Sequence, residues 1–171
     1  GAGSSLVKNP QRVHDLLAAM VSEAGDVPVT LKTRPGPRPD KVLMFELLDA
    51  AETAGARGIT LHARFTSQNH GGEVHLDLLA ELVGKAKIPV TGNGGVVDAD
   101  TLRAMADTGV AAVMIGRAAL PDPYIFTRLK GIDSDKLPSK SLFEKNLDAL
   151  VALHGQISER FPSDRLPSLD F

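Results

Sequence analysis

Two kinds of apolar pattern alternate along residues 9–120 of the chain. Short runs rich in β-branched residues are apolar without strict alternation, which is typical of parallel strands covered on both faces. These runs lie at 27–34, 58–64, 88–95 and 111–120. Segments with apolar residues at helical spacing lie at 9–25, 41–55, 76–86 and 98–109. The alternation predicts right-handed βαβ units with parallel strands, and hence an α/β fold.

The expected helices carry end signals. Asn9 and Pro10 supply a cap and a first-turn proline for the first helix. Gly55 follows the second helix and is a good C-terminal stop. Asp98 or Asp100 is expected to cap the fourth. The helix positions therefore rest on capping chemistry as well as on periodicity.

The alternation of strand and helix patterns ends after residue 120, where two prolines occur in the stretch PDPYIF. A polar linker follows at 131–141, then one expected helix at 141–161 and a tail rich in turn-forming residues. We interpret 1–126 as one region built from βα units and 127–171 as a short helical appendage.

Two parallel architectures could hold four such units: an open doubly wound sheet or a (β/α)8 barrel of the TIM type. Both place ligands at the carboxyl ends of the strands. Polar residues follow all four expected strands, at Lys32, His62, Asn93 and Arg117. A barrel gathers every strand end onto one mouth, so four contributing strands favour a barrel. Four units make only half of one, which would leave two strand edges exposed and open to self-association.

Composition narrows the function classes. The chain has 171 residues, 43% of them hydrophobic, a formal net charge of -2 and a pI of about 6.2. This is ordinary for a globular protein and lacks the basic bias common in nucleic-acid-binding domains. The chain contains no cysteine, so disulfides, thiolate metal sites and a cysteine nucleophile are excluded within it. No apolar run reaches the ~20 residues that span a bilayer, and no signal peptide or metal-binding motif is recognisable.

Two consecutive strand-end loops suggest a phosphate site. Asn93, Gly94 and Gly95 follow the third strand, and Gly116 and Arg117 follow the fourth. Glycine lets the backbone approach a ligand closely, a following helix N-terminus adds positive charge, and arginine can grip a phosphate with two hydrogen bonds. The alternative is two tight turns in which glycine serves a steric purpose only. Their occurrence in consecutive units favours phosphate binding.

The first two strands end in cations. Lys32 and Arg34 are two residues apart, as are His62 and Arg64, so each pair shares a face. Lys32 could face the electron-rich edge of a reduced cofactor ring or form a structural ion pair, and Arg34 could be a solvated loop residue. His62 joins the other strand-end residues around one rim, which favours a functional role. Gln68 and His70 are interpreted as solvated loop residues, and no role is assigned to His14, His75 and His154.

The ordered segments VPVTLKTR, GITLHAR, IPVTGNGG and AAVMIGRAALPDPYIF, with GAGSSLVKNP at the start, resemble the C-terminal half of the tRNA-dihydrouridine synthase family. The resemblance covers residues 1 to about 126 and implies an FMN-binding (β/α)8 barrel followed by a helical RNA-binding domain. It further implies a cytoplasmic flavoenzyme that uses NADPH and reduces a uridine of tRNA to 5,6-dihydrouridine.

Carried over to this sequence, the resemblance assigns flavin contacts to Lys32 and His62. It assigns the FMN phosphate to Asn93, Gly94, Gly95, Gly116 and Arg117. Arg34 and Arg64 match arginines expected to meet flavin or RNA. The cysteine that protonates C5 in the family is expected upstream, so we expect no catalytic residue in this chain and no activity from it alone. Pairing with an N-terminal half would supply that group.

Two other hypotheses remain open. One is another FMN barrel that oxidises or reduces a small molecule, which the phosphate loops alone would fit. The other is a half-barrel module without catalysis that dimerises to complete a barrel. Bound flavin, its response to tRNA and the state of association distinguish the three.

Overall fold

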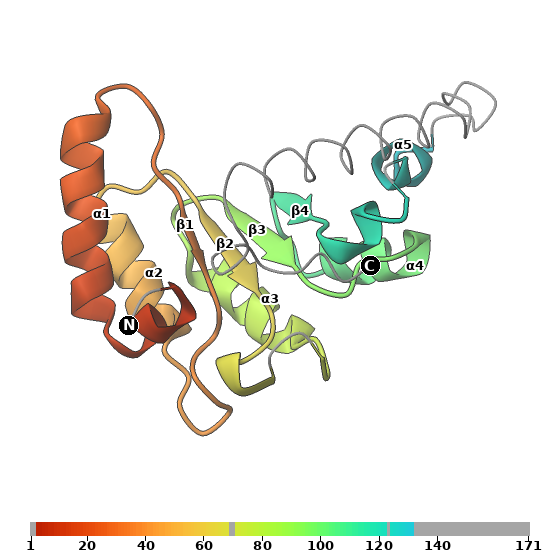
Figure 1. Ribbon diagram of the computed structural model, residues 1–171, viewed down its shortest axis with the longest axis horizontal. Helices are drawn as coiled ribbons and strands as arrows, with labels where there is room; N and C mark the ends of the chain where they lie inside the picture. The colour runs from red at the N-terminus through yellow and green to blue at the C-terminus, as the bar shows by residue number, and fades with distance from the viewer. Residues whose placement is uncertain (1–2, 69–70, 123, 132–171) are drawn as a thin grey trace, which may run out of the picture. The chain divides into compact units, whose positions relative to one another are not determined.

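The computed structural model of the protein describes residues 3–68, 71–122 and 124–131 (Figure 1). The chain divides into two compact units, Gly1–Ile125 and Phe126–Phe171. The second unit is described only at 126–131, which includes most of helix α5 (Ile125–Leu129). The linker, helix and tail expected after residue 131 lie outside the described residues.

The first unit is built on one sheet of four parallel strands. The strands are β1 (Leu31–Thr33), β2 (Ile59–His62), β3 (Val90–Asn93) and β4 (Ala112–Met114). Each falls within the run that predicted it but has only three or four residues. The register aligns Lys32, Thr60, Thr91 and Ala112 across the sheet.

The strands pair in chain order, β1-β2-β3-β4, without the reversal that marks a doubly wound sheet (Figure 1). Since right-handed crossovers between neighbouring parallel strands all lie on the same face, the connecting helices cover one side of the sheet. The predicted α/β class is confirmed, and the arrangement is that of a partial (β/α) barrel.

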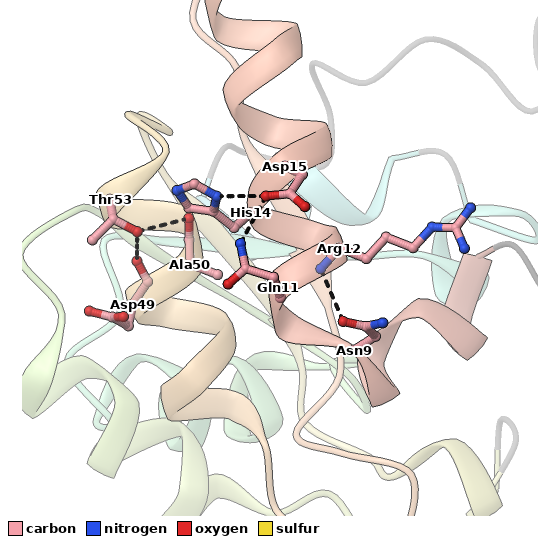
Figure 2. A network of polar contacts seen from close by, with 8 residues as sticks. All are labelled: Asn9, Gln11, Arg12, His14, Asp15, Asp49, Ala50 and Thr53. Atoms are coloured by element: carbon pink, nitrogen blue, oxygen red, sulfur yellow. Dashed lines mark hydrogen bonds and ion pairs between the residues drawn. The ribbon is translucent and has the colours of Figure 1, made fainter.

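Four helices connect and flank these strands: α1 (Pro10–Ala24), α2 (Met44–Thr53), α3 (Leu76–Lys85) and α4 (Ala99–Ala106). The predicted caps are present. The side chain of Asn9 accepts a hydrogen bond of 3.1 Å from the backbone N–H of Arg12 (Figure 2). Asp98, the first of the two candidates, caps α4 by accepting a bond of 2.9 Å from the Thr101 N–H.

A small polar network continues along α1 beyond its cap. Figure 2 shows Asp15 accepting from Gln11 Nε2 at 2.9 Å and lying 3.2 Å from His14 Nδ1. These two contacts, His14 first, lower the pKa of the exposed Asp15 carboxyl. On α2, the hydroxyl of Thr53 donates back to the carbonyl of Asp49 at 2.6 Å. These bonds are local, because each joins residues of the same helix.

Short elements were missed by the pattern analysis. They are the 3-10 helices η1 (Gly3–Lys8), η2 (Thr66–Gln68) and η3 (Arg117–Ala119), together with α5. A single turn of helix shows no apolar period, so periodicity does not reveal it. η3 replaces the second half of the run predicted as the fourth strand.

The core lies between the sheet and its helices. Leu47 of α2, Leu61 of β2, and Leu79 and Leu82 of α3 are fully buried. Burial of side chains of this size stabilises the fold by roughly 1.5–3 kcal/mol each. The inner strands are correspondingly the most buried elements of the sheet.

The apolar stripe of α1 is split. Val13 and Leu17 are buried in a cluster with η1 and α2, whereas Leu16 and Met20 remain 46% and 56% exposed. The exposed pair lines a hollow that also includes β1. Within the described residues, no strand pairs with the outer edge of β1 or of β4.

Candidate functional site

The predicted site residues converge on one cavity. It has a volume of about 470 Å³ and lies at the carboxyl ends of the strands. Every residue predicted to hold a cofactor lines it, and so does Arg64. The full predicted set in the cavity is Lys32, His62, Arg64, Asn93, Gly94, Gly95, Gly116 and Arg117.

The sheet register explains this convergence. His62 ends β2 directly beside Asn93, which ends β3, and Asn93 is in register with Met114 at the end of β4. Because parallel strands all end at the same edge, each following loop starts from that edge. Residues more than 80 positions apart, from Lys32 to Arg117, thereby surround one space.

The centre of the cavity wall is buried and internally bonded. His62 and Asn93 are each 9% exposed, and Arg64 is 7% exposed. Asn93 Nδ2 donates to the Met114 carbonyl at 2.8 Å, which ties the end of β3 to β4. Arg64 Nε donates to the Gly72 carbonyl at 3.1 Å. These side chains are therefore fixed before any ligand arrives.

A glycine turn forms the floor next to them. Gly94 and Gly95 have φ values of 125° and 73°, a region that L-residues with a side chain rarely adopt. A Cβ at Gly94 would lie 3.2 Å from His62 Cδ2, and one at Gly95 would lie 2.8 Å from Val74 Cγ2. Both conformation and space therefore require glycine here.

The two sides of the cavity are open to solvent. Lys32 on β1, and Gly116 and Arg117 after β4, are exposed. Although Lys32 is exposed as a residue, partial desolvation of its ammonium lowers its pKa, and repulsion by Arg34 lowers it further. Around Gly116 no atom lies within 4 Å of the position that a Cβ would occupy.

The electrostatic character of the cavity is cationic. Its described lining contains Lys32, Arg64, Arg117 and His62 and no aspartate or glutamate. Burial lowers the pKa of Arg64, and the charges of Arg117 and then Arg34 lower it further. Cations that repel one another in this way are stabilised when an anion enters between them. The arrangement is suited to binding an anionic group.

The N-terminus of α4 contributes less than the sequence suggested. Asp98 places its own carboxylate on the Thr101 N–H, and this backbone bond is the main reason why the pKa of Asp98 is lowered. Because that carboxylate accepts from one of the N–H groups of the first turn, fewer of those groups are available to a ligand.

Arg34 is not brought into this cavity. Its Nη1 donates to the Phe65 carbonyl at 2.9 Å and lies 3.5 Å from the Arg64 carbonyl. The contacts fasten the end of β1 to the segment after β2, and burial lowers the pKa of Arg34. Its side chain lines the neighbouring hollow beside α1.

Gln68 is also structural. Its Oε1 accepts from the Phe65 N–H at 2.7 Å and its Nε2 donates to the Glu73 carbonyl at 3.1 Å, which closes the loop after β2. Gln68 is half-buried in this loop, and both ends of its amide are bonded. His70 lies outside the described residues.

Some parts of the cavity were not identified from the sequence. Val96, Val97, Met114, Ile115 and Ala118 also line it. The Met114 carbonyl that orients Asn93 carries no signal in the residue type, because any residue has a carbonyl. Only the register of β3 against β4 reveals it.

Among the described residues, no three His, Asp or Glu side chains gather so as to hold a metal ion. In the part of the chain that the structure describes, no helix has the length and apolar character to cross a membrane.

The fold and the cavity define a βα-repeat protein with a cationic, glycine-floored pocket at its strand ends. The sequence matches the family described as Dihydrouridine synthase (Dus) over residues 1–164. The chain therefore belongs to the Dus family.

Curated relatives agree with this assignment. tRNA-dihydrouridine synthase B of Yersinia pestis is 40% identical over 130 residues, which cover 75% of this chain and 40% of the relative. The protein of the same name from Escherichia coli strain K12 is 39% identical over the same shares. The aligned region thus spans about 40% of the length of these relatives.

Among solved structures, the N-acetylmannosamine-6-phosphate 2-epimerase of Clostridium perfringens matches 71% of this chain and 49% of its own chain. The TM-score is 0.48 and the identity 22%.

Proposed function

We propose that this chain forms the FMN-phosphate half of an enzyme that reduces uridine in tRNA to 5,6-dihydrouridine with NADPH as the reductant. The proposal rests on membership of the Dus family together with the cavity at the strand ends. The observation that carries it is the convergence of cationic side chains and a positive-φ glycine turn on one space without an acidic residue in its described lining.

The phosphate of FMN would lie against Gly94, Gly95, Gly116 and Arg117. Two features of the chain fit this group. The absence of side chains at Gly94 and Gly95 lets His62, Arg64 and Val74 pack against the turn, and around Gly116 no atom lies within 4 Å of a Cβ position. Arg117 is exposed at the rim, where its planar fork can take two phosphate oxygens. Asn93 would hold the two loops together through its bond to Met114.

Lys32 and His62 would face the ring system of the cofactor. A cation beside the pyrimidine edge favours the anionic form of the reduced ring, and a donor there orients it. FMN bound here would supply hydride chemistry for the C5–C6 bond of uracil, and the target base would have to leave its stack to reach a site at a strand end. With no cysteine among the 171 residues, the proton for C5 comes from a group other than a thiol of this chain.

The regional interpretation follows the same proposal. Residues 1–126 would carry the cofactor-binding units, and 127–171 would contribute to a helical region that contacts RNA. Such an enzyme would act in the cytoplasm, where its tRNA substrate is.

Titration with FMN tests the proposal. The 171-residue chain should bind FMN more tightly than riboflavin, and Arg117→Ala should weaken FMN binding roughly 10- to 100-fold, the loss of one charge-assisted hydrogen bond of about 1.5–3 kcal/mol. Arg57→Ala is the matched control, because Arg57 is an exposed arginine that precedes β2 at the opposite end of the sheet. Equal affinity for FMN and riboflavin would contradict the phosphate site.

The response to tRNA tests the substrate. Uridine-containing tRNA should perturb the absorption spectrum of bound FMN. A flavin spectrum indifferent to tRNA would instead favour the alternative of an oxidoreductase acting on a small molecule.

We also propose that the outer edges of β1 and β4 are covered by further parallel strands, supplied by a second copy or by an N-terminal half. Unpaired strand edges and the exposed Leu16, Met20 and Met114 support this. Sedimentation of the chain should show a species larger than a monomer, and Leu16→Glu should reduce it. A monomer over the micromolar range would contradict self-association.

A further inference from the structure

Arg64 occupies an unusual position for a residue predicted to meet the ligand. It is 7% exposed, and its guanidinium reaches several parts of the cavity wall at once. Nε donates to the Gly72 carbonyl at 3.1 Å, and Nη1 lies 3.4 Å from His62 Nε2. A Cβ at Gly94 would lie 3.3 Å from Nη1, and one at Gly95 would lie 3.7 Å from Nη2.

We infer that Arg64 is a positioning residue, which holds His62 in the tautomer with its proton on Nδ1 and supports the Gly94–Gly95 turn. The part of this inference that concerns which ligand atom His62 meets rests on the proposed function, because the ligand is taken to be FMN. The tautomer itself is a property of the protein without a ligand.

The tautomer follows from donor chemistry. A guanidinium has five N–H donors and no acceptor, so a ring nitrogen that bonds to it must present a lone pair. His62 Nε2 is that nitrogen, and its proton is therefore on Nδ1.

The glycine turn fixes which edge of the ring faces inward. A Cβ at Gly94 would lie 3.2 Å from His62 Cδ2 and 3.6 Å from His62 Nε2. The Cδ2–Nε2 edge therefore faces the turn and Arg64, and Nδ1 lies on the opposite edge of the ring. Arg64 fills the space behind the turn, which gives the glycine backbone a rigid support.

A neutral His62 with a proton on Nδ1 selects the ligand atom that it can meet. It can donate to a carbonyl oxygen or to a deprotonated ring nitrogen, and it cannot accept from an N–H through that atom. The partner of His62 is thus a hydrogen-bond acceptor, such as a carbonyl of the pyrimidine ring of FMN. Arg64 influences which ligand atom is bound by setting the tautomer of His62, and not by contacting the charged group of the ligand itself.

Nitrogen-15 NMR of the ligand-free chain, labelled at histidine, measures the tautomer directly. The chain has five histidines, and loss of one signal set in His62→Asn assigns His62. At neutral pH the signals of His62 should show a protonated Nδ1 and an unprotonated Nε2. In Arg64→Gln they should move toward a mixture of the two tautomers. A protonated Nε2 in the unaltered chain would overturn the inference without any variant.

Cofactor affinity separates positioning from simple charge. Arg64→Lys keeps the charge, but its single ammonium cannot bond to Gly72 and His62 with the geometry of the fork. We therefore expect Arg64→Lys to lose at least about tenfold in FMN affinity, nearly as much as Arg64→Gln, because neither side chain reproduces the fork that contacts Gly72 and His62 together. Arg57→Gln, at an exposed arginine outside the cavity, should leave the affinity unchanged.

The two proposals can fail independently. Full FMN affinity in Arg64→Lys with loss in Arg64→Gln would show that Arg64 acts by its charge and would overturn the positioning role. A protonated Nδ1 in a chain that binds no FMN would leave the tautomer assignment intact and would defeat the proposed function. Circular dichroism of each variant controls for loss of fold.

Discussion

The middle and the sides of the cavity differ in the burial and hydrogen bonding of the side chains that line them. The ends of β2 and β3 supply His62, Arg64 and Asn93, all at least nine-tenths buried. Arg64 contacts His62, and Asn93 donates to the Met114 carbonyl of β4. The ends of β1 and β4 supply Lys32 and Arg117, which are exposed. The middle of the cavity is thus lined by buried, hydrogen-bonded side chains, and its two sides are lined by exposed charged side chains.

The difference arises from the sheet. An inner strand has a partner on each edge and a helix behind it, so its end is held from three directions. An edge strand has one partner strand, so its end is held by fewer neighbours: the end of β1 by the Arg34 bond to Phe65 and the end of β4 by the Asn93 bond to Met114. The comparison teaches that strand position within the sheet determines which residues shape a ligand and which only attract it.

Truncation of one core residue on each kind of strand should give the largest difference. Leu61→Ala on β2 removes a fully buried side chain and should lower the free energy of unfolding by about 2–5 kcal/mol. Val113→Ala on β4 removes a half-buried side chain and should cost about 1 kcal/mol or less. Urea unfolding of both variants measures the losses. Similar losses would remove the distinction between inner and edge strands.

Substitution of a glycine on each side of the cavity, Gly95 and Gly116, should give a smaller difference in unfolding free energy, again with the larger loss near the inner strands. Gly95→Ala forces a side chain into a φ of 73° and toward Val74, which should cost about 1–2 kcal/mol. Gly116→Ala adds a methyl group where no atom lies within 4 Å, and the cost should stay below about 1 kcal/mol. Thermal unfolding compares them. A larger loss at Gly116 would show that the β4 side is the more constrained of the two.

The smallest expected effect is the pH dependence of ligand affinity that Lys32 causes. Its lowered pKa means that the ammonium loses its proton below the usual lysine range, so affinity for an anionic ligand should fall as the pH rises through that value. The fall should be roughly two- to fivefold, the contribution of an exposed ion pair. FMN titrations between neutral and alkaline pH measure it. Lys32→Arg keeps its charge throughout, and an unchanged pH profile in this variant would exclude Lys32 as the source.

The protonation of Lys32 affects the free energy of unfolding in the opposite direction to ligand affinity. Between the lowered pKa of Lys32 and the ordinary lysine value, the unfolded chain binds more protons than the folded chain. In that window this lysine makes the free energy of unfolding rise with pH. Ligand binding and folding should therefore respond to alkaline pH in opposite directions.

Much of the fold could be predicted because strand and helix signals are local. The apolar runs located every strand, and Asn9 and Asp98 marked two helix starts. Strand lengths could not be predicted in the same way. Hydrogen bonding to a neighbouring strand ends where the loops diverge, and no residue type in the run 111–120 records that point.

The site was predictable to the level of strand ends. Lys32 lies within β1, His62 and Asn93 end β2 and β3, and Arg117 follows β4. All four line one cavity, although what they bind stays a prediction. Arg34 shows the limit. Its spacing from Lys32 matches that of Arg64 from His62, yet its guanidinium is bonded to the Phe65 carbonyl outside the cavity. Tertiary contacts with loops decide such cases, and sequence spacing does not contain them.

The capping of α4 by Asp98 has a consequence for the response of this protein to ionic strength. With that helix end occupied, the positive charge available to a ligand comes largely from Lys32 and Arg117 in water. Such charges are screened over about 8 Å at physiological salt. We expect the chain to retain an anionic cofactor in dilute buffer and to release it during a high-salt wash, so the colour of the purified protein should depend on the salt used to prepare it.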